Sequence, residues 1–433
     1  MIPAFLPLLI GFVGFFGHDT ANEHQAPAVV QLERISTAVP WPRGLVFTDG
    51  KLFALARGRH RRAGGPDPAI EDMAGALFTV DPSISEPVVI GVKAGDAIRA
   101  NGEVYALPTS PPFRPWDRRL VPAKKDTTMD RPYCTLVWDP TSQNFFICGF
   151  SGADNSDGTF RKNATDSVLR FDTRNRSWNV VDVHNPDVVP VDTLSNWAPS
   201  RYYPHHDPAT HTPPHGWLNG PNGATAVGES LYVVAKDNSL MVRYDLAEIE
   251  SDPAAPPPEG VPFLGSEATV RIKGTPQTMK IEGHSALAAS DDYLYVGFRT
   301  TSQVVRFPLH EDGTLVQPLV GDLIALFEPY DPSTRLSADL IDMAFNNRGE
   351  LFVSTGERGG IWNLGFPDPQ RVFDGREGKG TQPVIDVPAL SGKPKARVGN
   401  ICFDDEDRLY FCSGNYDASS NLAGVIYRVD LGD

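Results

Sequence analysis

Positive charge is scarce in this sequence of 433 residues. Its 39 Lys and Arg stand against 54 Asp and Glu, which gives a formal net charge of −15 at pH 7. No long basic block occurs, and binding to nucleic acid is disfavoured because phosphate neutralisation needs clustered Lys and Arg. The sequence also lacks a Gly-x-Ser-x-Gly elbow, a P-loop and a dinucleotide fingerprint. Helical periodicity is nowhere sustained, whereas 39 Gly and 39 Pro supply many turns.

Cysteine is scarce too, and the four residues do not have the spacing of a zinc site or a haem attachment motif. Cys134 and Cys148 bracket one strand–turn–strand segment, and Cys402 and Cys412 bracket another. In each segment, counting residues inward from both cysteines leads to the turn. This predicts that the two cysteines of a pair lie directly opposite one another on two antiparallel strands. Two cross-strand disulfides are then possible in an oxidising compartment. Alternatively, the cysteines are small buried apolar residues at equivalent repeat positions.

One sequence pattern occurs six times: a short apolar strand, a tight polar turn and a second apolar strand. The copies begin at Gly44, Cys134, Gly223, Ser285, Asp342 and Asn400. Most are followed by a third strand that ends in an acidic turn, as in "SVLRFDTRN" and "GVIYRVDL". Such a unit cannot bury its own faces, so the copies must stack on one another. Repeats of roughly 40 to 60 residues built from strands alone predict an all-β, six-bladed β-propeller.

The repeat spans nearly everything after residue 40, which predicts a single propeller domain over residues 25–433. The last copy has three strands, whereas "VVQLERI" (Val29–Ile35) precedes the first copy and has a strand pattern. We expect this N-terminal strand to complete the last blade and close the ring, since closure removes exposed sheet edges. The stretch 94–131 is long enough for a degenerate blade, so the sequence does not exclude a seventh.

Residues 1–17 are uncharged and mostly apolar, and this length suits a signal-peptide core better than a full membrane span. No Lys or Arg precedes the run, and no clean small-x-small cleavage site follows it. We expect residues 1–24 to be a signal peptide, or else an N-terminal membrane anchor. The expected location is therefore periplasmic or extracellular.

Long irregular stretches are predicted between the end of one blade and the first strand of the next, at 94–131, 193–219, 311–338 and 366–397. In a propeller these connections emerge on the face where the innermost strands begin, so we expect loops that cap one face and mark a ligand site. A further insertion, Arg57–Asp72, is expected to leave the first blade elsewhere. Its basic run "RGRHRR" (Arg57–Arg62) either clamps an anionic group or is a solvated loop.

Residues just before each innermost strand are expected to converge on the mouth of a central channel. Aligning the copies places near this ring Arg43, Tyr133, Cys134, Asn222, His284, Asp342 and Asn400. Amide and carboxylate oxygens that meet at one point suit Ca²⁺, and a histidine among them admits other divalent ions. Alternatively, these polar residues line a water-filled tunnel and hydrogen-bond its ends.

The segment "GPNGATAVGESLYVVAKDNSLMVRYDL" from Gly220 resembles the Pro-Asn-Gly blade of the senescence-marker-protein/gluconolactonase superfamily of six-bladed propellers, with its paraoxonase and strictosidine-synthase relatives. In the gluconolactonase family the Asn of this motif binds the catalytic divalent metal, which implies that role for Asn222. The resemblance also implies an Asp in the next blade, as ligand and base, and an acidic ligand near the start of the first blade. This chain has His284 where that Asp is expected and Arg43 where the acidic ligand is expected, so the resemblance implies the fold but not lactonase activity.

Four of the 10 histidines lie within eleven residues in the segment that leads to Asn222: His205, His206, His211 and His215. Imidazole can ligate a metal or act as a general base, and the interleaved prolines give the segment a rigid, extended path. We expect at least one of the four, with His215 as the candidate base, to contribute to the site. The alternative is a surface loop without a partner.

These features predict an exported, metal-dependent hydrolase that acts on a small lactone or ester. The expected ligands of the ion, most simply Ca²⁺, are Asn222, His284, Asp342 and Asn400. The ion would polarise the carbonyl and activate a bound water, His284 or His215 would act as base, and Arg43 would stabilise an oxyanion. A non-catalytic propeller that binds a glycan, peptide or protein is the alternative. A quinone-dependent sugar dehydrogenase is a third interpretation, but it needs a basic pocket, and the predicted ring is sparse in Arg and Lys.

Overall fold

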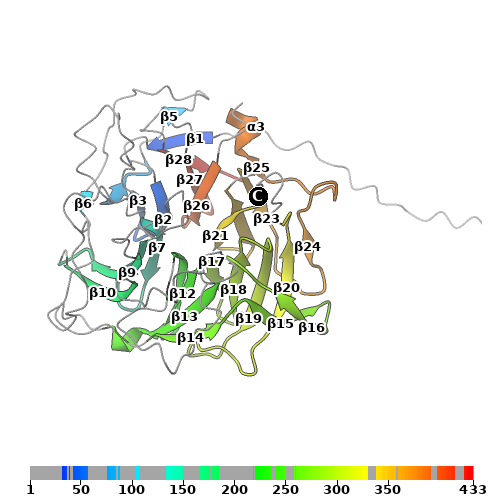
Figure 1. Cartoon of the computed structure of the whole chain (residues 1–433). Helices are drawn as coiled ribbons and strands as arrows, with labels where there is room; N and C mark the ends of the chain where they lie inside the picture. Colours follow the sequence, from blue (N-terminus) through cyan, green and yellow to red (C-terminus); the bar gives the residue numbers. More distant parts are fainter. Residues whose placement is uncertain are drawn as a thin grey trace, which may run out of the picture.

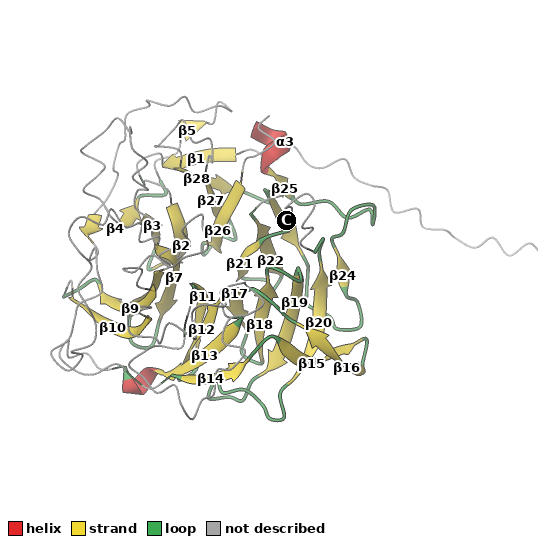
Figure 2. Ribbon diagram, viewed as in Figure 1, coloured by secondary structure: helices red, strands yellow, loops and turns green. Residues whose placement is uncertain are grey.

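A computed structural model provides the fold and describes 32–36, 42–56, 76–83, 86–87, 104–106, 133–149, 166–175, 177–184, 220–236, 239–249, 260–329, 338–356, 359–391, 397–414 and 424–432, with the single residues 39, 218 and 258. Strands dominate these residues (Figure 2), and helix occurs among them only as the short α3 (Val387–Ser391) and the 3-10 turn η2 (Leu246–Glu248). The described chain is therefore all-β, as the turn-rich sequence predicts.

The strands form six sheets, one for each copy of the repeated pattern, and five of them are wholly antiparallel, whereas the sheet of the fourth blade also contains parallel pairings. The first blade consists of β2 (Pro42–Thr48), β3 (Lys51–Ala56), β4 (Ala76–Val80) and β6 (Val104–Ala106). The second consists of β7 (Tyr133–Asp139), β8 (Asn144–Gly149), β9 (Asp166–Asp172) and β10 (Ser177–His184). The third consists of β11 (Pro221–Val227), β12 (Ser230–Ala235), β13 (Leu240–Asp245) and β14 (Val261–Leu264).

Of the other three blades, the fourth and the sixth carry additions to this four-stranded plan. The fourth consists of β17 (His284–Ala289), β18 (Tyr293–Phe298), β19 (Gln303–Pro308) and β20 (Val320–Leu326), extended by the hairpin β15 (Glu267–Ile272) and β16 (Thr275–Lys280) and by β24 (Phe373–Asp374). The fifth consists of β21 (Leu340–Phe345), β22 (Leu351–Thr355), β23 (Gly360–Asn363) and β25 (Ile385–Asp386). The sixth consists of β26 (Arg397–Phe403), β27 (Leu409–Gly414), β28 (Gly424–Val429), β1 (Leu32–Ser36) and β5 (Glu86–Pro87).

The innermost strands surround a central axis (Figures 1 and 2). Each is the neighbour of the next in the order β2, β7, β11, β17, β21 and β26, and β26 lies beside β2 again. Because β2 and β7 are direct neighbours, the stretch between them adds no seventh blade to the ring. The predicted six-bladed propeller is confirmed.

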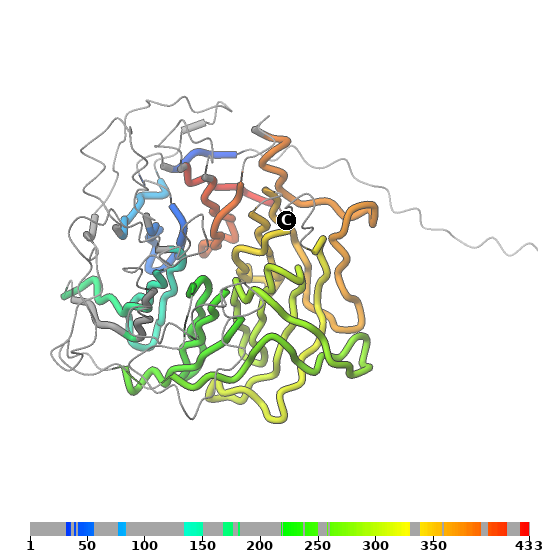
Figure 3. The backbone as a smooth tube through the Cα atoms, in the orientation of Figure 1, coloured from blue at the N-terminus to red at the C-terminus, as the bar shows by residue number. Residues whose placement is uncertain are grey.

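The N-terminal strand closes the ring, as predicted. β1 pairs with β28, placing Leu32 opposite Val429 and Glu33 opposite Arg428, and in Figure 3 the blue strand lies beside the red C-terminal segment. Arg428 Nε donates to Glu33 Oε2 at 2.7 Å, so an ion pair reinforces the junction. The predicted signal peptide or anchor lies outside the described residues. In the part of the chain that is described, no helix has the length and apolarity to cross a membrane.

The connections differ in part from the sequence-based expectation. Ala56, the last residue of β3, pairs with Pro42, the first residue of β2, because the second strand of a blade runs back beside the first. The insertion Arg57–Asp72 lies outside the described residues, but the strand ends Ala56 and Ala76 on either side of it lie at the face where the inner strands begin, which contradicts the expectation that it leaves elsewhere. The stretches 94–131, 311–338 and 366–397 are not wholly irregular, since they supply β6, β20, β24, α3 and β25.

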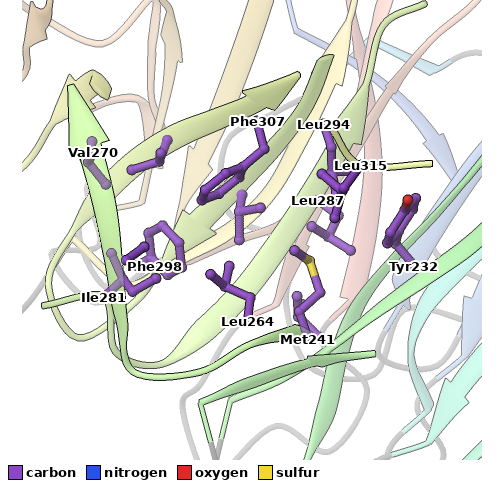
Figure 4. Packing of buried hydrophobic residues seen from close by; sticks show 14 of the residues in the cluster. Tyr232, Met241, Leu264, Val270, Ile281, Leu287, Leu294, Phe298, Phe307 and Leu315 are labelled. Atoms are coloured by element: carbon purple, nitrogen blue, oxygen red, sulfur yellow. The ribbon is translucent and has the colours of Figure 1, made fainter. Parts of the chain in front are cut away.

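Apolar side chains fill the spaces between neighbouring blades. Between the third and fourth blades, Tyr232 and Met241 from one sheet pack with Leu287, Phe298 and other residues of the next (Figure 4). The second strands β8 and β12 are buried along their whole length, because both faces of each sheet are covered. Burial of apolar surface stabilises the stacked blades by roughly 25 cal/mol per Å².

The cysteine pairs do not lie directly opposite one another, so that prediction is wrong. Thr135 faces Cys148 because a β-bulge sets Cys134 out of register. In the sixth blade the turn places Cys402 opposite Tyr410. All four cysteines are free thiols, and Cys148 and Cys412 are buried at equivalent positions of β8 and β27. For these two, the packing agrees with the alternative of small buried apolar residues.

Candidate functional site at the axial end of the inner strands

Every inner strand carries a β-bulge near its first residues, at the same level around the axis. The bulged residues are Arg43, Cys134, Asn222, Ser285, Ile341 and the pair Gly399 and Asn400. A bulge inserts one extra residue and re-aims the side chains beside it. The structural equivalent of Asn222 in the fourth blade is therefore Ser285, whereas His284 is equivalent to Pro221.

Polar side chains at these bulges link one blade to the next. Thr135 Oγ1 donates to the Asn222 carbonyl at 2.5 Å, and Asn222 Nδ2 donates to the Ser285 carbonyl at 3.3 Å. Ser285 Oγ in turn donates to the Leu340 carbonyl at 2.7 Å. The second, third, fourth and fifth blades are thus joined in sequence by side chains of the predicted ring and their neighbours.

The chain of contacts continues through the fifth and sixth blades to the first. Asp342 Oδ2 accepts the backbone N–H of Ile401 at 3.0 Å, and Cys412 Sγ lies 3.8 Å from the Arg43 carbonyl. We call this set of contacts the inter-blade belt. It agrees with the alternative that polar residues at this level hydrogen-bond the inner strands.

His284 lies inside the protein. Its side chain is fully buried, and its ring stands edge to face against Phe298 at 4.8 Å between centroids. Neither ring nitrogen makes a hydrogen bond of ordinary geometry with a described residue. Burial lowers the pKa of His284 to about 3, against a small opposing effect of the Gly265 backbone. At neutral pH this imidazole is neutral and has no access to a ligand on the axis.

Asp342 and Asn400 interact with one another at the axial end. Asp342 is half-buried, and loss of hydration raises the pKa of its carboxyl to about 7, although hydrogen bonds from the Ile401 and Met343 backbones and from Asn400 act in the opposite direction. Asn400 is buried, and its Oδ1 has no partner among the described residues. A carboxyl with a pKa near neutrality beside an unsatisfied amide oxygen has the properties of a proton-transfer site.

Arg43 brings positive charge to the same end. It is half-buried, and burial lowers the pKa of its guanidinium, while the carboxylate of Asp339 acts against that change and the positive charge of Arg397 adds to it. Asp339 immediately precedes β21 of the fifth blade, and Arg397 begins β26 of the sixth. Asp339 is itself paired with Arg299.

The residues at this end fit a resident divalent cation poorly. Among the described residues of the predicted ring, the oxygen donors are the neutral amides of Asn222 and Asn400 and the carboxyl of Asp342. The Asp339 carboxyl at the same end is paired with Arg299, and His284 offers no accessible nitrogen. A site for Ca²⁺ normally contains several carboxylates, and Arg43 adds charge of the wrong sign. Nowhere in the described ranges do three His, Cys, Asp or Glu side chains converge as a metal site requires.

Several predicted site residues lie outside the described part of the chain: His205, His206, His211, His215 and the run Arg57–Arg62, together with the side chain of Tyr133. The structure adds two residues that the sequence analysis missed, Asp339 and Arg397. Both could have been found from the repeat, since each lies three residues before a predicted ring residue, at or next to the start of an inner strand.

No protein-family model matches the chain, and no curated protein matches it. Among solved structures it is similar to a streptogramin B lyase (TM-score 0.42, 10% identity, 93% of this chain and 98% of the lyase). It is also similar to the calcium-binding protein regucalcin of Agrobacterium tumefaciens (0.44, 9%, 92% and 92%). A third is the PQQ-bound aldose sugar dehydrogenase of Streptomyces coelicolor (0.44, 13%, 94% and 99%). These distant matches include the group that the Pro-Asn-Gly segment resembles, but at such identities they assign no activity, ligand or residue role to this chain.

Proposed function

We propose that the axial end is the active site of a hydrolase that acts on small lactones or esters. The observation that carries the proposal is the half-buried Asp342 carboxyl, whose pKa of about 7 makes it a base at physiological pH. It lies in the inner strand β21, next to the unsatisfied Asn400 amide oxygen. Arg43 provides the positive charge that an ester carbonyl needs as it becomes an oxyanion.

In this mechanism the ionised Asp342 removes a proton from water as the water oxygen attacks the substrate carbonyl carbon. The carbonyl oxygen gains negative charge, which the Arg43 guanidinium stabilises by donated hydrogen bonds. The C–O bond to the leaving oxygen then breaks, and the proton held by Asp342 passes to that oxygen. One water is consumed, and a carboxylic acid and an alcohol are formed.

The metal dependence suggested by the resemblance is not needed for these steps. The oxygen donors Asn222, Asp342 and Asn400 fit Ca²⁺ poorly, and no step of the scheme involves a metal. Metal analysis of protein purified without chelator tests this point. Stoichiometric Ca²⁺ that is lost in Asn222→Ala would contradict the metal-independent scheme.

The test is a screen with γ-butyrolactone and p-nitrophenyl acetate. We expect kcat/KM to rise with pH through about 7, since the base is the ionised form of Asp342. Asp342→Asn should lower kcat by about 100-fold or more. The matched control is Asp291→Asn, an exposed aspartate in the turn between β17 and β18, which should keep full activity. Equal losses in both variants would show that Asp342 has no special role.

A binding propeller without catalysis is the second candidate, and the inter-blade belt favours it. Thr135, Asn222 and Ser285 use their polar groups to join the blades, as they would in a purely structural ring. A folded protein that turns over neither probe would favour this candidate, with a small molecule, glycan or peptide as the ligand.

A further inference from the structure

The hairpin of β15 and β16 extends the fourth blade beyond its four-stranded plan. β16 (Thr275–Lys280) is the last strand of the sheet, and among the described residues β15 is its only strand neighbour. Its residues are exposed except for the half-buried Met279, and the strand lies at the periphery of the molecule (Figure 1). The hairpin therefore presents a sheet edge to solvent, and an edge of this kind is a template for pairing with another strand.

The turn of the hairpin fixes the hydrogen-bond pattern of its two strands. Lys273 and Gly274 have positive φ angles of 48° and 85°, as in the type I′ turn of a two-residue loop. Such a turn makes the flanking residues Ile272 and Thr275 a hydrogen-bonded pair, and these pairs alternate along an antiparallel ladder. The odd-numbered residues of β16 therefore direct their backbone groups toward β15.

The even-numbered residues of β16 direct their backbone groups outward. The Ile281 N–H donates to the Ser266 carbonyl at 2.8 Å, which confirms the alternation at the far end of the hairpin. Pro276 lies at an outward position, where the ladder with β15 does not require its missing N–H. The outer edge of β16 thus offers the carbonyl of Pro276 and both backbone groups of Thr278 and Lys280.

This edge is complementary to a second copy of itself. When two copies of β16 are placed antiparallel about a two-fold axis at Thr278, Pro276 of each copy lies opposite Lys280 of the other. The two Thr278 residues then exchange both of their backbone hydrogen bonds. Each Lys280 N–H donates to a Pro276 carbonyl, so in this register the absent N–H of Pro276 removes one bond at each end and leaves the others in place.

The charges at the edge match in the same register. Lys280 faces the uncharged Pro276 of the other copy, so like charges are not opposed across the paired strands. Glu282 contacts Lys280 of its own chain at 2.7 Å, and in this register it comes beside the turn that holds the exposed Lys273 of the other copy. Opposite charges therefore meet at both ends of the paired strands, because the two-fold axis repeats each contact.

We propose that the protein forms a symmetric dimer in which two β16 strands pair antiparallel about Thr278. The sheets of two fourth blades then become one continuous sheet across the two-fold axis. A second copy of this chain is the partner, because the register that uses the outward backbone groups also brings Glu282 to Lys273. The inference goes beyond the proposed function and does not depend on it, since β16 lies at the outer end of its sheet and the axial site lies at the inner strands.

The test is sedimentation velocity of the full-length protein at concentrations from about 1 to about 300 μM. We expect a reversible dimer with a Kd on the order of 10 μM, because one strand from each copy makes a small interface. Thr278→Pro removes the central outward N–H and should weaken dimerisation about tenfold or more, while the ladder with β15 stays intact, as it does at Pro276. The matched control is Thr278→Ala, which keeps that N–H and should dimerise nearly as the wild type does.

A second variant decides the question if Thr278→Pro does not fold. Lys273→Asp reverses the charge that faces Glu282 of the other copy and should also weaken dimerisation, and aspartate tolerates the positive φ of this turn position. Its control is Lys51→Asp, which makes the same change of charge at an exposed residue of the first blade and should leave dimerisation unchanged. The proposal is overturned if the wild type is monomeric at about 300 μM, or if the folded variants at Thr278 and Lys273 dimerise as their controls do.

Discussion

At the residue scale, the same physical cause gives His284 and Asp342 opposite chemical properties. Removal from water disfavours the charged form of either group, so it lowers the pKa of the imidazole and raises that of the carboxyl. At neutral pH the His284 imidazole is uncharged, whereas the Asp342 carboxyl, with a pKa of about 7, is present in both its protonated and its ionised form. The residue types were visible in the sequence, but the environment that decides between these outcomes was not.

The buried His284 predicts a specific loss of stability in acid. Its folded pKa of about 3 lies below the unfolded value of 6.5, so as pH falls below 6.5 the unfolded chain takes up a proton that the folded protein excludes. This difference in proton uptake should lower the free energy of unfolding by about 2 kcal/mol between about pH 7 and about pH 5. In His284→Leu this loss of stability should disappear, and urea unfolding at the two pH values measures it.

The control for that experiment is His310→Gln, which changes an exposed histidine in the loop after β19. It should retain the acid sensitivity of the wild type. If His284→Leu loses as much stability between the two pH values as the wild type does, the buried histidine is not the source.

At the element scale, the backbones of neighbouring inner strands approach one another closely where the inter-blade belt lies. Gly223 follows the bulge of β11, and a Cβ there would lie 2.5 Å from the Ser285 carbonyl oxygen of the next blade. Gly44 holds the equivalent position in β2, where a Cβ would lie 2.6 Å from Leu136 Cβ. Neither neighbour can move without shifting an inner strand.

We therefore expect Gly223→Ala to destabilise the protein by about 3 kcal/mol, at the upper end of the cost of overpacking. The measurement is the midpoint of urea unfolding. Gly265→Ala is the matched control, because a Cβ at Gly265 meets no atom within 4 Å. Similar stability of the two variants would mean that the inner strands can separate at little cost.

The regular parts of each blade were predictable from the sequence, and the bulges were not. The last copy, predicted to have three strands, corresponds to β26, β27 and β28. Alternating apolar residues identify such strands because both sheet faces are covered. A bulge leaves little trace in that pattern, which is why His284 was aligned with Asn222 and Cys134 with Cys148.

At the scale of the whole molecule, the ring depends on a strand from the far end of the chain. β1 covers the edge of β28 and adds the pair between Glu33 and Arg428. Deletion of residues 1–36 should expose that edge and produce a protein that aggregates or unfolds at a lower temperature. Size-exclusion chromatography and thermal unfolding measure both effects.

The matched truncation removes residues 1–31 and leaves β1 in place. It should remain monodisperse and as stable as the longer protein. Identical behaviour of the two truncations would show that β1 is dispensable and that the last blade is stable with three strands.

The sequence by itself determined the architecture. Six copies of one strand–turn–strand pattern, a turn-rich composition and one additional N-terminal strand predict a closed six-bladed ring. This works because strand periodicity and repeat length are local properties, and stacking follows from the need to bury both faces of each sheet. Only the tertiary structure decided the site. It placed Arg43, Asp339, Asp342, Asn400 and Arg397 at one end and removed His284 into the interior, because bulge positions, desolvation and charge balance depend on contacts between blades.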